Sequence, residues 1–484
     1  TGNTVGFDSW VNNPSRGGFV SWMHSLQPQT NPTTFPFDTY GYVTSNWQQN
    51  GSRAKLTFNR RSGADGSTLT PYTSGVTVLS AWLIWSGFHT KTGNTDTGGG
   101  SSSINTPVTF GRPNGQKSPV SAVARTVRAT RGRYYVSAAD VTQMVREAGP
   151  GDYTVEGIPM LRNVTYDSGA GWTLAVAWSH PNEPFRNLTM WTGNQVVVAG
   201  TTIDVDTATV SGFCTPATGT VRARVLVSAT EGDAYVDTGS PSSDGSSDTL
   251  SLGRPAGAGY TFTRLSGPRN LIGNFFAGQI NDDAGVRDVS GDPNGPHHNP
   301  PGTTDGARQG WDVTNVDGTG VLGNSQTSAQ VRIQTYNDQI IVNALGIQCD
   351  VGAPMPPTET LVVDKPLTSL GDTLTYTTTY TNMGGTAAAE QTTYTSQPAL
   401  GLSFIPGSVT VNGVPTPGAD PSVGVNVGTV AIGQTVTVTY QLRVDALPLE
   451  PAPARYDVEG EWSYDFLSCP GMPSNLSVGS AGVA

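Results

Sequence analysis

The feature that most constrains this chain is the alternation of apolar and polar residues with a period of two. In VRARVLVSA, five apolar residues fall on one face of a strand: Val221, Ala223, Val225, Val227 and Ala229. The same pattern recurs in AKLTFNR, VTVLSAWLIW, GWTLAVAW, TLSLG, AQVRIQTY and QIIVNALGIQC, and clusters of Gly, Pro, Asn, Asp and Ser separate these segments. Such spacing is typical of half-buried strands joined by turns. The sequence therefore predicts an all-β fold, with a large jelly-roll-like β-sandwich over residues 51–350.

One segment, SAADVTQMVREAG, favours a short helix over residues 138–148. Its apolar residues Val141, Met144 and Val145 have the three-and-four spacing of a helix that lies on a sheet. Ser137 is the expected N-cap, and Gly149 is the expected end of the helix.

Four tryptophans lie in two strongly apolar segments, and they are either core or a sugar-binding platform. Alternation places Trp172 and Trp178 on one face together with Leu and Val, and it puts Trp82 and Trp85 on opposite faces that are both apolar. Rings flanked by aliphatic residues on a strand are most often core. We therefore expect all four to be buried. The better candidates for a sugar platform are the rings at Trp47, Trp191 and Trp311.

A domain boundary falls in the Pro-rich segment VGAPMPPTET, residues 351–360. Residues 361–468 then show about seven short strands, which is typical of an immunoglobulin-like sandwich. Residues 469–484 form a C-terminal tail, and residues 1–50 form an N-terminal arm with many Pro and Asn breaks.

The region after the boundary resembles a known repeat. Gly371, Asp372, Tyr376, Asn382 and Gly384, followed by LSFIPGSVTVNG and VGTVAIGQTVTVTYQLRV, resemble the repeat of bacterial surface proteins called domain of unknown function eleven. The segments AWLIWSG, GAGWTLAVAWSHPNEPFRNLTMWTG and NFFAGQI resemble the large β-domain that often precedes this repeat. The resemblance implies an extracellular bacterial protein with a structural or adhesive role, and it implies no enzymatic activity.

Composition restricts the partners. Only 13% of residues are charged, and 37 acids against 26 bases give a net charge of −11. This balance argues against binding to nucleic acid or to an anionic membrane. No apolar run approaches the roughly 20 residues of a membrane span. The chain starts at Thr1 without Met, so we expect that a targeting segment has been removed and that the protein is secreted, extracellular or on the cell surface.

Motifs of enzyme chemistry are not found. The sequence has no His-Glu-x-x-His, no Gly-x-Ser-x-Gly and no phosphate loop, so we expect that the protein is not an enzyme. The pair His297 and His298 could bind a transition metal, and its alternative is a solvated Pro-rich loop. Lys365 could form an isopeptide bond with Asp457, and its alternative is an ordinary surface lysine.

Calcium is the one candidate cofactor. The Gly-rich segments EGDAYVDTGSPSSDGSSD and NDDAGVRDVSGDPNG offer the hard oxygen ligands that Ca²⁺ prefers. Glu231 and Asp233 are the first candidates because they end an apolar strand. The alternative is that these acids only make the loops soluble.

The three cysteines, Cys214, Cys349 and Cys469, allow one disulfide. An odd number of strands in the C-terminal sandwich would carry Cys469 to the far end of that domain. This reasoning predicts a bridge between Cys214 and Cys349, with three free thiols as the alternative.

Aromatic residues of the N-terminal arm are the predicted interface: Trp10, Phe19, Trp22, Phe35 and Phe37. Aromatic residues are enriched at interfaces, and an extended segment can complete the open edge of a neighbouring sheet. We therefore expect a structural subunit of an extracellular filament, sheath or surface layer, with copies of itself as partners. Two alternatives are that the arm wraps its own domain, and that the protein is a monomeric adhesin whose partners are surface glycans.

Overall fold

The computed structural model describes residues 5–11, 51–62, 68–88, 103–127, 134–159, 170–180, 183, 186–199, 203–230, 248–268, 270–276, 311–336, 338–354, 360–383, 387–448, 455–466, 475–476 and 481–483. These residues form an all-β fold with one short helix, as predicted. Residues 51–350, for which one large sandwich was predicted, contain two.

The first sandwich, here called the first roll, has two antiparallel sheets around one core. Its inner sheet runs in the order β1 (Val5–Val11), β11 (Ala170–Ser179), β5 (Thr77–Phe88), β9 (Tyr134–Asp140) and β8 (Ala124–Val127). Its outer sheet runs in the order β2 (Gly51–Leu56), β10 (Gly151–Glu156), β6 (Val108–Gly111) and β7 (Lys117–Val120). A hairpin of β3 (Asn59–Ser62) and β4 (Thr68–Pro71) follows β2. Most connections cross from one sheet to the other as in a jelly roll, whereas β6 with β7 and β8 with β9 form hairpins within one sheet.

The second roll repeats this order of strands. Its inner sheet is β12 (Arg186–Val198), β19 (Gln339–Asp350), β14 (Ala223–Thr230) and β17 (Trp311–Asp317). Its outer sheet is β13 (Asp204–Ser211), β18 (Ser328–Thr335), β15 (Thr249–Ala256) and β16 (Gly259–Arg264). The five apolar residues predicted to share one face of VRARVLVSA all lie in the core of this roll.

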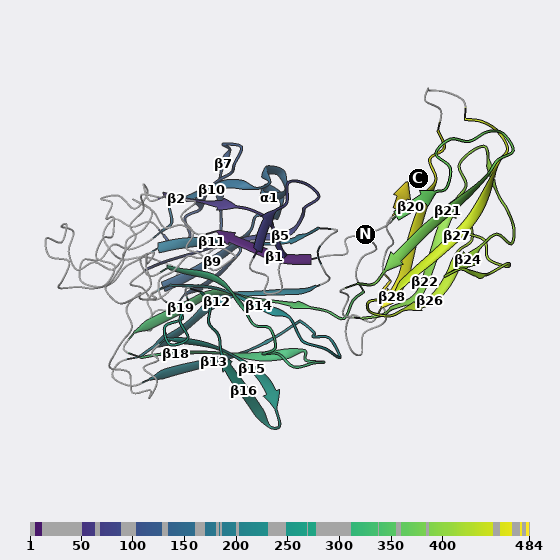
Figure 1. Cartoon of the computed structure of the whole chain (residues 1–484). Helices are drawn as coiled ribbons and strands as arrows, with labels where there is room; N and C mark the ends of the chain where they lie inside the picture. The colour runs from purple at the N-terminus through teal and green to yellow at the C-terminus, as the bar shows by residue number, and fades with distance from the viewer. Residues whose placement is uncertain are drawn as a thin grey trace.

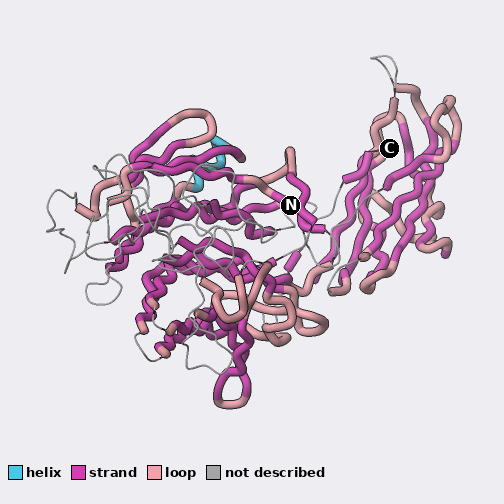
Figure 2. The backbone as a smooth tube through the Cα atoms, turned by 60° about the vertical axis from the view of Figure 1, so that its left-hand side comes forward, coloured by secondary structure: helices cyan, strands magenta, loops and turns pink. Residues whose placement is uncertain are grey.

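The two inner sheets pack against each other, so the rolls form four layers (Figures 1 and 2). A separate apolar cluster lies between them and includes Ile84, Val136, Leu226 and Ile341. This contact explains the tryptophans. Trp85 faces the core of the first roll, whereas Trp82, on the opposite face of β5, packs half-buried against the cluster between the rolls.

The helix α1 (Thr142–Ala148) is shorter than the predicted one, because β9 continues through Asp140. Ser137 is not the cap: it is a buried strand residue, and the N-cap position is Val141. An Asp140 carboxylate oxygen accepts a hydrogen bond from the Thr142 amide at 2.8 Å. No helix in the described ranges is long and apolar enough to cross a bilayer.

The C-terminal sandwich stands to one side of the rolls (Figure 1). One sheet has β20 (Thr360–Val363), β21 (Thr373–Thr381), β27 (Thr435–Val444), β24 (Thr410–Val411) and β25 (Val414–Pro415), with β23 (Leu402–Phe404) also pairing with β27. The other has β26 (Val425–Val430), β22 (Ala389–Gln397), β28 (Glu459–Phe466) and β29 (Asn475–Leu476), with β30 (Ala481–Val483) also pairing with β28. Every second residue is buried along both β21 and β27, because one face of each strand is covered.

The strand directions of this sandwich decide where its chain ends. The Ala387 amide bonds to the Ala353 carbonyl, so β22 begins near the rolls. Gln397 at the far end of β22 pairs with Glu459, and Glu390 pairs with Asp465. The last long strand, β28, therefore runs back toward the rolls and ends there at Phe466.

Candidate functional site

The predicted calcium ligands Glu231 and Asp233 lie outside the described residues, as do the second acidic segment and the pair His297 and His298. The strand before them, β14, ends at Thr230, which is buried and pairs with Trp311. Within the described ranges, no three His, Cys, Asp or Glu side chains gather as a metal site would require. Calcium binding therefore stays a prediction.

The predicted aromatic interface also lies largely outside the described residues, which exclude Phe19, Trp22, Phe35 and Phe37. Trp10 belongs to β1, of which the backbone is described. This strand pairs with β11 of the same chain, and Phe7 lies opposite Ala177. For these seven residues the structure agrees with the alternative in which the arm wraps its own domain.

The prediction that four tryptophans are buried is confirmed for three of them. Trp85, Trp172 and Trp178 are buried in the first roll, and Trp82 is half-buried between the rolls. Trp311, a candidate for the sugar platform, is fully buried. Its ring lies so close to Gly171 of the first roll that a Cβ added to this glycine would lie 2.5 Å from the ring. Every aromatic side chain that the structure describes is buried or half-buried. Trp191, another candidate for the sugar platform, is half-buried.

The predicted bridge between Cys214 and Cys349 is wrong. Cys349 is a free, buried cysteine, and Cys214 is disulfide-bonded. The prediction failed because it assumed an odd number of strands, whereas β28 brings the chain back toward the rolls. Cys214 itself packs with Val351 in the core of the C-terminal sandwich. The third cysteine, Cys469, follows β28 by three residues and lies outside the described residues.

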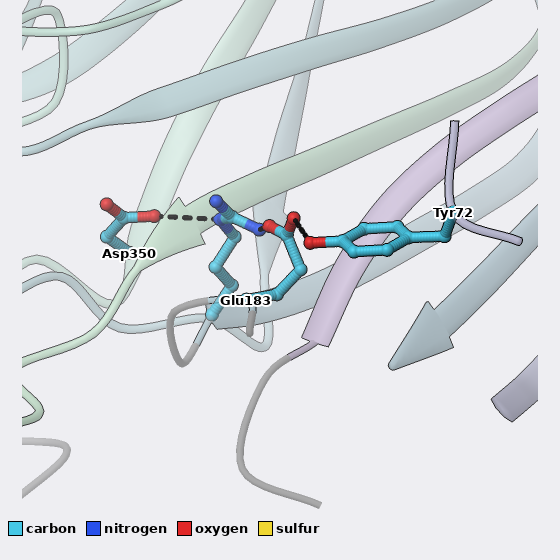
Figure 3. A network of polar contacts seen from close by, with 4 residues as sticks. Tyr72, Glu183 and Asp350 are labelled. Carbon is cyan, nitrogen blue, oxygen red and sulfur yellow. Dashed lines mark hydrogen bonds and ion pairs between the residues drawn. The ribbon is translucent and has the colours of Figure 1, made fainter. Parts of the chain in front are cut away.

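Four polar side chains link the two rolls (Figure 3). The Tyr72 hydroxyl donates to Glu183 Oε1 at 2.8 Å, and Arg186 Nη1 donates to Glu183 Oε2 at 2.8 Å. Arg186 Nε also donates to Asp350 Oδ1 at 3.0 Å. Burial lowers the pKa of Arg186, but the charges of Asp350 and Glu183 outweigh it, so the pKa is raised overall. The guanidinium is therefore a permanent charge held between two carboxylates.

The segment HPNEPFRN supplies two members of this network, Glu183 and Arg186. His180 stacks on Tyr72 with ring centroids 3.7 Å apart, and it is buried. The ring of Tyr72 also meets Trp178 edge-on at 5.7 Å. These contacts hold three described residues of this segment, His180, Glu183 and Arg186, so they have a structural role here. The sequence missed Tyr72, because nothing in its own segment indicates this distant partner.

An apolar slot of about 400 Å³ opens between the inner sheets. It is lined by side chains of β5, β11 and β12: Ser80, Trp82, Ala175, Ala177, Leu188, Met190 and Thr192. Its volume is within the range of small-ligand pockets. The slot lies beside β1, because Phe7 pairs with Ala177. We call it the inter-roll slot.

Exposed leucines gather at the end of the C-terminal sandwich that points away from the rolls. Leu367, Leu370, Leu400 and Leu447 have exposed fractions of 88%, 64%, 98% and 52%. Backbone bonds hold their three turns together: the Gly371 amide bonds to the Val444 carbonyl, and the Asp445 and Ala446 amides bond to the Gly401 carbonyl. We call this surface the leucine tip. These leucines lie in turns rather than in apolar runs, so no sequence pattern indicates them.

Lys365, proposed for an isopeptide bond, lies in one of these turns and is exposed. Its proposed partner, Asp457, has a carboxylate oxygen 3.0 Å from Arg455 Nε. Nothing in this arrangement brings the lysine and the aspartate together.

Comparisons with known proteins add little. No family model matches the chain, and no curated protein matches it. A solved peptide-N(4)-(N-acetyl-β-D-glucosaminyl) asparagine amidase is 11% identical, with 62% of this chain and 96% of that chain covered, at a TM-score of 0.19. A putative membrane anchored protein from Corynebacterium diphtheriae is 8% identical, with 98% and 95% covered, at a TM-score of 0.17. Both scores are too low to support an argument about fold or function.

Proposed function

We propose that this chain is a structural subunit of an extracellular bacterial surface assembly, such as a filament, sheath or surface layer. It polymerises through contacts of its β-domains and its terminal segments. The observation that carries the proposal is the leucine tip, a group of large apolar side chains held on ordered turns at one end of the molecule.

Such a surface favours a protein partner. Exposed apolar groups that are contiguous and held on ordered backbone mark interaction sites more often than scattered single residues do. Burying one leucine side chain contributes about 1.5–3 kcal/mol. The tip therefore offers a substantial part of the free energy of a subunit contact.

The chemistry of the tip fits another copy of this chain. The inter-roll slot is an apolar surface on a different part of the molecule, lined by Trp82, Leu188 and Met190. Two different surfaces that meet head to tail form an open chain of subunits rather than a closed dimer. The low charge of the whole sequence and its resemblance to bacterial surface repeats also favour this function.

Electron microscopy of the purified protein tests the proposal. The double variant Leu367→Ser with Leu400→Ser replaces two side chains that face solvent, so the monomer should stay folded while polymers shorten or disappear. Ile432→Ser is the matched control, since Ile432 is 56% exposed in a turn at the opposite end of the same sandwich. That variant should polymerise normally.

Two results would contradict the proposal. A native protein that stays monomeric at high concentration is not a subunit of a polymer. Polymers that form equally well in the double variant would show that the tip takes no part. A monomer that binds immobilised glycans would instead favour the adhesin alternative.

A further inference from the structure

The two rolls differ in how their first strand is attached. In the second roll, β12 and β13 are joined by residues 199–203, a connection of five residues. In the first roll, the equivalent strands β1 and β2 are joined by residues 12–50, a connection of 39 residues. Connections in compact domains usually have about 4–6 residues. The strands β1 and β2 lie in contact, so closing the roll does not require this length.

The strand β1 also occupies a position that must be filled. It forms the edge of the inner sheet, next to β11. The neighbouring strand β11 is buried on both faces, with Trp172 and Val176 toward the core and Thr173 and Ala175 toward the second roll. Without β1, the backbone groups along one side of this strand would form an open edge, and such an edge pairs readily with a strand of another chain.

We propose that β1 is exchanged between copies, so that Val5–Val11 of one chain pairs with β11 of the next. This inference rests on the proposed function, since it names the acceptor site of the terminal segment in the polymer. A connection of 39 residues reaches up to about 130 Å when extended, which is enough to span a neighbouring subunit. The exchanged strand makes the same hydrogen bonds as the closed one, so concentration and the length of the connection decide which form is populated.

The inter-roll slot lies next to the site on β11 that would accept the exchanged strand. Ala177 lines the slot and lies opposite Phe7 in the register of β1. The site that accepts the exchanged strand is therefore continuous with the wall of an apolar cavity.

Engineered disulfides across β1 and β11 test the exchange. Val5 lies opposite Ser179, and Phe7 lies opposite Ala177. Directly opposed residues in an antiparallel pair have Cα atoms about 4.5–5.5 Å apart, which suits a disulfide. The variants Val5→Cys/Ser179→Cys and Phe7→Cys/Ala177→Cys are each prepared in unlabelled and isotopically heavy form, mixed as monomers, assembled and oxidised. Gly6→Cys/Ser179→Cys is the matched control, because its side chains point to opposite faces.

Exchange predicts a ladder of covalent multimers on a non-reducing gel for both opposed pairs and little crosslinking for the control. In an equal mixture, about half of the crosslinked peptide pairs should combine a heavy and a light chain. Polymers with purely intramolecular crosslinks would overturn the exchange and leave the proposed function standing. Monomers with intramolecular crosslinks and no polymer under the microscope would overturn both.

Discussion

The two rolls have the same strand order, but they differ in the length of the connection between their first two strands. In the second roll, a connection of five residues ties β12 to β13, so its first strand stays with its own sheets. In the first roll, 39 residues separate β1 from β2. The second roll is closed by a short connection, whereas the long connection of the first roll makes the exchange of β1 that we propose possible.

The rolls are nevertheless not separate domains. Their inner sheets bury a common apolar cluster, and the Thr173 and Ser228 hydroxyls meet across it at 2.8 Å. The C-terminal sandwich is attached differently, through Cys214, Val351 and Ala353 at one end of its core. We therefore expect the two rolls to unfold together and the C-terminal sandwich to unfold by itself.

The largest expected effect comes from emptying a core. Trp172→Ala in the first roll should cost about 3–5 kcal/mol and Ile347→Ala in the second about 2–5 kcal/mol, because both side chains are fully buried. Both variants should lower the same transition in calorimetry. Trp462→Ala, in the C-terminal sandwich, should lower a different one. Three separate transitions would show that the rolls are independent.

The next effect concerns the ionic link between the rolls. Arg186→Met leaves Glu183 and Asp350 as buried charges without their cation, which should cost about 3 kcal/mol in urea unfolding. The triple variant Arg186→Met/Glu183→Gln/Asp350→Asn removes all three charges and should recover most of the loss. If Arg186→Met is as stable as the native protein, the network does not hold the rolls together.

A pH effect should come from the free cysteine of the second roll. Burial, with a contribution from Asp350, raises the pKa of Cys349 from 9.0 to about 12. In the unfolded chain the thiol ionises above pH 9, while in the folded chain it stays protonated up to about pH 12. The free energy of unfolding should therefore fall by up to about 1.4 kcal/mol per pH unit in this window. The Cys349→Ala variant should lose this contribution and keep that of the buried tyrosines Tyr153, Tyr376 and Tyr380, whose pKa values burial also raises.

Alkylation checks the same cysteine chemistry. At pH 8 a thiol reagent should label no cysteine of the folded protein and should label one, Cys349, after unfolding without reduction. Because Cys214 is disulfide-bonded, we expect the peptide map to pair it with Cys469. A second labelled cysteine would contradict the disulfide.

The smallest effect tests the polar contact between the inner sheets. Thr173→Val leaves the Ser228 hydroxyl without this partner in a buried site, which should cost about 1 kcal/mol. The double variant Thr173→Val/Ser228→Ala should be closer to the native stability, because both polar groups are gone. A double variant that loses the sum of two single losses would mean that the two hydroxyls act independently.

Particular residues show which features could be predicted from the sequence and which could not. It predicted that both faces of VLSAWLIW are covered, and Trp85 and Trp82 do lie on opposite covered faces. The predicted helix began too early because serine is a common N-cap residue. In the structure, the pairing of β9 with β5 keeps Ser137 and its neighbours extended. The sequence could not indicate Tyr72, because 111 residues separate it from Glu183.

Local features could be predicted from the residues alone: which segments are strands, which face of each strand is apolar, and that most of the large tryptophans lie inside. The alternation of apolar and polar residues indicates these features because successive side chains of a strand point to opposite faces. Other features appear only in the folded chain: the two rolls in place of one, the free Cys349, and the four leucines that share one tip. These depend on the number and direction of strands and on which sheet meets which, and such long-range relations leave no mark in a local pattern.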